Sequence, residues 1–228
     1  MSCPSGWFPG VESELIMLEK IAFLDIDTQR DFMFPNGALY VPGAEEIIEP
    51  LEDLMKLARG ACIPVFSTAD AHPSDDPSFR QWPPHCVTGT PGQLRIPETT
   101  LAGARIIPNR PFNLEPQLYL TGQTIFEKTD YDATSNPNLG AVVRQLSISR
   151  LVAFGVATDY CVQGTVLSIR RMGIAVDLVV DAIKGISEEA HQAAISRMMA
   201  AGVKAVTTAH VLAEFAGVKN LGASRNGR

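Results

Sequence analysis

Cys161 is the side chain of this sequence best suited to act as a nucleophile. It lies in the segment GVATDYCVQGT, after an apolar stretch that predicts a strand and in the first turn of a predicted helix. Backbone N–H groups and the dipole at a helix start favour a thiolate, so we expect a lowered thiol pKa. A buried, inert thiol is the commoner fate of a free cysteine, and we assign it to Cys62, inside a predicted strand.

A thiol nucleophile needs a proton acceptor, and Asp27 is the predicted base. It ends the apolar segment IAFLDID, where partial desolvation would raise its carboxyl pKa toward the range of a general base. Lys128 ends another predicted strand and would hold the carboxylate and the thiolate in position. Each has an ordinary alternative role, Asp27 as a turn or helix cap and Lys128 as a surface charge.

Asp70, His72 and His85 form a second cluster, typical of metal ligands. Side chains at i and i+2 of an extended segment point the same way, so Asp70 and His72 can converge on one ion while His85 returns from the following loop. Two imidazoles and one carboxylate suit one divalent ion, with Zn(II) expected first and Fe(II) or Mn(II) as alternatives. The plain alternative is a pair of solvated loop histidines, because D-x-H is common by chance.

The elements that must position these residues alternate along the chain. Apolar runs predict strands at 21–27, 62–70, 124–128, 150–157, 176–182 and 204–209, and helical patterns predict helices at 44–59, from Pro137, at 159–172 and at 187–201. Continuous apolar strands are expected when helices cover both sheet faces. We therefore predict a three-layer α/β/α, doubly wound fold with a mainly parallel sheet of about six strands.

In such a sheet, ligands bind beyond the carboxyl ends of the strands, where the chain order reverses. Several predicted strand ends carry a reactive side chain or lead to one: Asp27, Asp70, Lys128, Asp181 and the segment before Cys161.

Composition excludes several classes of protein. The chain has 228 residues, 46% hydrophobic and 19% charged, which suits one globular domain. A net charge of -6, from 25 acids against 19 bases, argues against a nucleic-acid partner. No apolar run approaches the roughly 18 residues of a membrane span, and no signal-peptide pattern opens the chain. We therefore expect no membrane partner. The four scattered cysteines lack disulfide spacing, so we expect reduced thiols and a cytoplasmic location.

Separated motifs follow one another over residues 20–210: IDTQRDFM, DAHPSDDPSF, WPPHCVTGTPG, FEKTDYD and GVATDYCV. Together they resemble the isochorismatase-like cysteine hydrolases and, among these, the nicotinamidases. The resemblance implies a catalytic triad of Asp27, Lys128 and Cys161, with Asp70, His72 and His85 as metal ligands.

The same resemblance implies further features of the site. Phe32 and Trp82 would form aromatic walls around a pyridine ring whose nitrogen the metal holds. The Val156–Ala157 peptide bond would be cis, and the amides of Ala157 and Cys161 would form an oxyanion hole. The resemblance also implies a hydrolase domain at 19–217 between an N-terminal extension at 1–18 and a flexible tail at 218–228, and a homo-oligomer.

The implied activity is hydrolysis of a linear carboxamide. Asp27 would take the thiol proton, the thiolate would attack the amide carbonyl, ammonia would leave, and water would cleave the thioester. Nicotinamide would give nicotinate, a reaction of pyridine nucleotide salvage. The segment TDYDATSNPN after Lys128 resembles other amidases of the superfamily, so another small amide, ureido or carbamoyl substrate is the alternative.

Two interpretations from other classes stay open. The metal could be the reaction centre of a two-histidine, one-carboxylate iron oxygenase, with Cys161 merely structural. The chain could also be a binding or scaffolding protein without catalysis. The presence of every polar site residue argues against binding alone, because binding needs no nucleophile.

Overall fold

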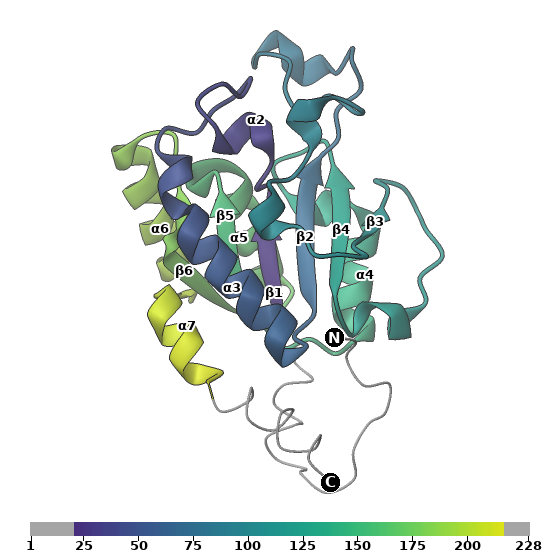
Figure 1. The fold of residues 1–228 in the computed structure, drawn as a ribbon, viewed down its shortest axis with the longest axis vertical. Helices are drawn as coiled ribbons and strands as arrows, with labels where there is room; N and C mark the ends of the chain where they lie inside the picture. The colour runs from purple at the N-terminus through teal and green to yellow at the C-terminus, as the bar shows by residue number, and fades with distance from the viewer. Residues whose placement is uncertain (1–20, 217–228) are drawn as a thin grey trace, which may run out of the picture.

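The sheet of this protein is parallel throughout, and helices pack against it (Figure 1). The structure is a computed structural model that describes residues 21–216, so the expected extension at 1–18 and tail at 218–228 lie outside the described residues. The described part contains seven strands in the order β3-β4-β2-β1-β5-β6-β7. Their bounds are β1 Ile21–Ile26, β2 Val65–Asp70, β3 Arg105–Ile107, β4 Gln123–Lys128, β5 Arg150–Val156, β6 Ala175–Lys184 and β7 Lys204–Val206.

Helices cover both faces of the sheet, which confirms the predicted three-layer fold. The α-helices of the described part are α2 Arg30–Met33, α3 Ile48–Ala61, α4 Pro137–Gln145, α5 Gln163–Arg171, α6 Glu188–Ala200 and α7 Thr208–Glu214. One core contains Phe23 of β1 and packs under α3 and α7, which lie in front of the sheet in Figure 1. The other contains Leu24 of β1 and packs under α4, α5 and α6. Neighbouring side chains of β1 therefore lie in the cores on opposite faces of the sheet, because side chains alternate along a strand.

The structure differs from the sequence prediction at three elements. The seventh strand is β3, a three-residue edge strand whose middle residue Ile106 is exposed, and it is too short to give a periodic pattern. The predicted strand at 204–209 ends early, because Thr207 caps α7 by accepting a hydrogen bond from the His210 N–H at 3.2 Å. Cys62 lies at the end of α3 rather than in β2 and is disulfide-bonded, so the expected reduced thiol is wrong at this residue.

The chain order reverses between β1 and β5. The strands β2, β4 and β3 lie on one side of β1, and β5, β6 and β7 lie on the other. Asp70 and Lys128 are register partners at the ends of β2 and β4, so both side chains reach the same edge. Asp181 does not, because it lies inside β6 and its carboxylate accepts hydrogen bonds from the N–H and hydroxyl of Thr208 at 2.8 and 3.1 Å.

Within residues 21–216, the structure contains no helix with the length and apolarity needed to cross a membrane.

Candidate active site

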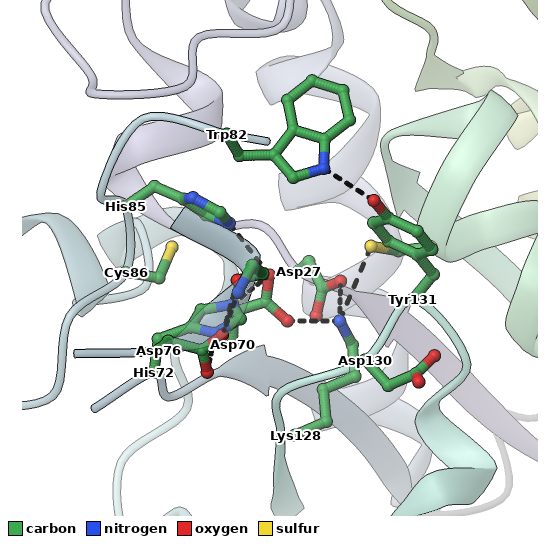
Figure 2. A network of polar contacts seen from close by, with 12 residues as sticks. Asp27, Asp70, His72, Asp76, Trp82, His85, Cys86, Lys128, Asp130 and Tyr131 are labelled. Atoms are coloured by element: carbon green, nitrogen blue, oxygen red, sulfur yellow. Dashed lines mark hydrogen bonds and ion pairs between the residues drawn. The ribbon is translucent and has the colours of Figure 1, made fainter. Parts of the chain in front are cut away.

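Lys128 contacts both other members of the expected triad, so the three residues form one cluster at the carboxyl ends of the strands (Figure 2). Its side chain is completely buried, and Nζ lies 2.7 Å from Asp27 Oδ2 and 3.5 Å from Cys161 Sγ. Nζ also donates a hydrogen bond to Asp70 Oδ1. One ammonium group therefore contacts two carboxylates and the thiol, so the surface-charge alternative for Lys128 is wrong.

Asp27 directly follows β1, and its backbone turns the chain away from the sheet. Its φ of 49° lies in the left-handed region, which aspartate tolerates better than most residues. Thr68 of β2 holds the side chain from the neighbouring strand, because its hydroxyl donates to Asp27 Oδ1 at 2.6 Å and its Oγ1 accepts from the Asp27 N–H at 3.2 Å. Sequence reasoning missed Thr68, whose only signal is a polar residue inside an apolar run.

Cys161 lies in a turn of π-helix, η7 Thr158–Val162, between β5 and α5. Single π turns inside helices are frequent at functional sites. The preceding Val156–Ala157 peptide bond is cis, as the resemblance implies. Gly155 permits β5 to lie close to β1, since a Cβ at this position would lie 2.0 Å from the Ile26 carbonyl oxygen.

Burial sets the protonation states of this cluster. It raises the pKa of the Cys161 thiol well above its usual value, and the Lys128 ammonium opposes that rise only in part. It also raises the pKa of Asp27, against the same opposing charge. For Lys128 burial acts the other way, but Asp27 and Asp70 raise its pKa well above the usual value. The expected lowering of the thiol pKa is therefore wrong, and a base is needed to form the thiolate.

The carboxylate of Asp27 lies close enough to Cys161 to act as this base. A carboxylate oxygen of Asp27, one of Asp70 and the sulfur of Cys161 all lie within 4.8 Å of one another. Burial disfavours ionisation of Asp70, yet the Lys128 ammonium holds its pKa well below its usual range. Asp70 is therefore the fixed anion of the pair, and Asp27 is the carboxyl group able to exchange a proton.

The other oxygen of Asp70 faces the two loop histidines. Asp70 Oδ2 lies 3.5 Å from His72 Nε2 and 3.7 Å from His85 Nε2, and all three side chains are buried. Two ligand atoms each about 2.1 Å from a tetrahedral ion lie about 3.4 Å apart, so this donor set fits a divalent metal ion. The solvated-loop alternative for these histidines is wrong.

Hydrogen bonds at Nδ1 orient both imidazole rings so that their Nε2 atoms face Asp70 Oδ2. His72 Nδ1 lies 2.9 Å from Asp76 Oδ2, and His85 Nδ1 lies 2.8 Å from the Pro83 carbonyl oxygen. A ring that donates from Nδ1 keeps the Nε2 lone pair for a metal. Sequence reasoning missed Asp76, although it lies in the quoted segment DAHPSDDPSF.

Aromatic side chains line the pocket that opens onto Cys161. Phe32 is buried, with its ring centroid 5.5 Å from that of His85. The Trp82 indole N–H donates to the Tyr131 hydroxyl at 2.6 Å (Figure 2), and both rings lie 5.3 Å from the ring of Tyr160. All of these rings line the pocket together with Ala157 and Cys161. The pocket contains both expected aromatic residues and two tyrosines that sequence reasoning did not assign.

Comparison with known proteins extends these observations. The family model of the isochorismatase domain matches residues 22–114 and 108–210. The nicotinamidase/pyrazinamidase of Mycobacterium tuberculosis is 30% identical over 192 residues, which cover 81% of this chain and 97% of the relative. The nicotinamidase of Acinetobacter baylyi is 26% identical over 224 residues, 89% of this chain and 99% of the relative. Among solved structures, a pyrazinamidase of Pyrococcus horikoshii in complex with zinc has a TM-score of 0.70 and 30% identity, covering 82% of this chain and 99% of the other.

Proposed function

This chain belongs to the isochorismatase family of hydrolases, and we propose that it is a metal-containing nicotinamidase that forms nicotinate and ammonia through a thioester on Cys161. Its nicotinamidase and pyrazinamidase relatives make it an amidohydrolase that acts on a carboxamide C–N bond. The nature of the amide, the metal and the covalent intermediate form the proposal.

One observation carries this proposal. The Lys128 ammonium contacts Asp27, Asp70 and Cys161 at once, and Asp70 turns its other oxygen toward His72 and His85. The buried Lys128 ammonium therefore contacts both the thiol with its base and the carboxylate that belongs to the metal-ligand set. The metal-centred oxygenase alternative gives no role to the contacts among Asp27, Lys128 and Cys161.

The protein groups perform the proton transfers of the proposed reaction. Asp27 takes the proton from Cys161 Sγ as the sulfur attacks the carboxamide carbon, and Lys128 stabilises the negative charge that moves between them. The N–H groups of Ala157 and Cys161 donate to the developing oxyanion. Asp27 then delivers its proton to the amide nitrogen, which leaves as ammonia. It next takes a proton from the water that attacks the thioester, and it returns this proton to Cys161 Sγ as the carboxylic acid product leaves.

Asp70, His72 and His85 would hold the metal ion. When bound, the ion would supply a Lewis acid able to hold a ring nitrogen of the substrate. The pocket residues suit a flat ring, since Phe32 and Trp82 offer aromatic surfaces next to this ligand set.

Ammonia release from nicotinamide tests the proposal. We expect turnover by the unmutated protein and a loss of at least about 10⁴-fold in kcat in Cys161→Ala, as for other removed nucleophiles. Cys86→Ala is the matched control, because Cys86 is another buried free thiol of the described chain and its sulfur faces the Gly92 carbonyl rather than the pocket. It should retain turnover.

A substrate panel separates the proposed amide from its alternative. Nicotinamide and pyrazinamide should be hydrolysed with a higher kcat/KM than ureido acids and carbamoyl compounds. Preference for a ureido or carbamoyl compound, lost in Cys161→Ala, would retain the amidohydrolase chemistry and overturn the nicotinamidase assignment. Turnover that survives in Cys161→Ala but is abolished by chelation would favour the oxygenase alternative.

A further inference from the structure

Gln29 is completely buried beside the site, and the proposed reaction gives it no role. It belongs to the motif IDTQRDFM, two residues after Asp27. Its side-chain amide makes contacts on both sides: Oε1 accepts from the Asp70 N–H at 2.7 Å, and Nε2 donates to the Asp70 carbonyl oxygen at 2.8 Å. Nε2 also donates to the Gln93 carbonyl oxygen at 2.8 Å.

These bonds replace a missing strand partner. The pairing of β1 with β2 ends at Ile26 and Thr68, because the chain turns away from the sheet at Asp27. The main-chain N–H and carbonyl of Asp70 are thereby left without a β1 partner at the last residue of β2. The amide of Gln29 has the donor and acceptor of a peptide group, and it fills that place.

The consequence concerns the carboxylate of Asp70. Its Oδ1 accepts from Lys128 and its Oδ2 faces the two histidines, so a small rotation of the Asp70 backbone would move both contacts. We propose that Gln29 is a positioning residue for the metal site, which fixes the backbone of Asp70 so that its carboxylate meets the ion. This inference rests on the metal ligands of the proposed function.

The chain contains a closely matched control. Gln123, at the start of β4, is also buried and likewise accepts one hydrogen bond and donates two. Its Oε1 accepts from the Leu101 N–H at 2.8 Å, and its Nε2 donates to Ser67 Oγ at 2.8 Å and to the Thr99 carbonyl oxygen at 2.7 Å. It lies five residues before Lys128, about 16 Å along the strand.

The experiment compares Gln29→Met with Gln123→Met in the full chain. Methionine keeps the length of the side chain, adds no charge and removes all three hydrogen bonds. Each metal-stripped protein is titrated with Zn²⁺ against a chromophoric chelator, and its unfolding midpoint in urea is measured without metal. Both variants should lose stability, because each leaves buried main-chain groups without partners.

The metal affinity should separate the two variants. We expect the Kd for Zn²⁺ to rise roughly 10- to 100-fold in Gln29→Met, as for other lost outer contacts of a metal ligand, and to stay within about threefold in Gln123→Met. Excess Zn²⁺ should restore amide hydrolysis in Gln29→Met. Equal Kd values in the two variants would overturn the positioning role and leave only a structural one.

Milder variants keep the test decisive if a methionine protein fails to fold. Gln29→Asn and Gln123→Asn retain an amide that is one methylene too short to reach its partners, and the same difference in Kd is expected. If the unmutated protein binds no Zn²⁺, the metal site of the proposed function fails and this inference fails with it. Normal Zn²⁺ binding by both the unmutated protein and Gln29→Asn contradicts the inference alone.

Discussion

Replacing Lys128 with methionine removes a buried ammonium but keeps the length of the side chain. Its two carboxylate partners stay in the protein interior, since Asp27 is 0% and Asp70 5% exposed. Removing one member of a buried ion pair costs about 3 to 5 kcal/mol, because the remaining charge has no compensation. For a domain of this size, that loss of unfolding free energy lowers Tm by about 6 to 20 °C.

The pH dependence of the Lys128→Met variant follows from burial. Burial raises the pKa of Asp27, and the loss of Lys128 removes the charge that most opposes this rise. A carboxyl group whose pKa is higher in the folded state binds its proton more tightly when folded. The stability of the variant should therefore fall as pH rises through that pKa, and its deficit should shrink in acid.

Urea unfolding of the metal-stripped protein measures this effect, since a bound divalent ion would supply the missing positive charge. Lys56→Met is the matched control, because Lys56 also pairs with two carboxylates, Glu52 at 3.0 Å and Asp53 at 3.7 Å, but on the exposed face of α3. It should unfold at the same urea concentration as the unmutated protein. Equal midpoints for Lys128→Met and Lys56→Met would refute the reasoning.

Further variants test the surroundings of the site. Tyr131→Phe removes the hydrogen bond to the indole without changing the ring, and KM for nicotinamide should rise about 2- to 10-fold with kcat nearly unchanged. The bond from Thr68 lowers the pKa of Asp27, so the acidic limb of the kcat/KM profile should move to higher pH in Thr68→Val and stay in place in Thr68→Ser; a downward shift would contradict this role. Asp76→Ala frees Nδ1 of His72, and Zn²⁺ affinity measured by chelator competition should fall about 10- to 100-fold; an unchanged affinity would rule out the outer contact.

The sequence predicted the fold class and the approach of three side chains to the segment before Cys161. Parallel strands bring their carboxyl ends to one edge, so Asp27, Asp70, Lys128 and the segment before Cys161 had to approach one another once the strands were located. The spacing of Asp70 and His72 likewise predicted that their side chains point the same way, and in the structure the two side chains approach each other. These predictions need only strand order and alternation.

Other features depend on three-dimensional packing and could not be predicted in this way. The raised pKa of Cys161 arises chiefly from burial, which outweighs the helix start that the sequence suggested. The contacts of Thr68 and Gln29 depend on where β1 leaves the sheet, and no single residue type marks that point. The strand β3 is too short for a periodic pattern, and the position of Asp181 inside β6 depends on a register shift between β5 and β6.

Mass spectrometry of the protein quenched in acid during nicotinamide turnover tests the central claim most directly. The account predicts a nicotinoyl adduct on the peptide that contains Cys161, which forms before ammonia release is complete, disappears as substrate is exhausted and is absent in Cys161→Ala. Turnover without any adduct, together with ammonia release that persists in Cys161→Ala, would contradict it.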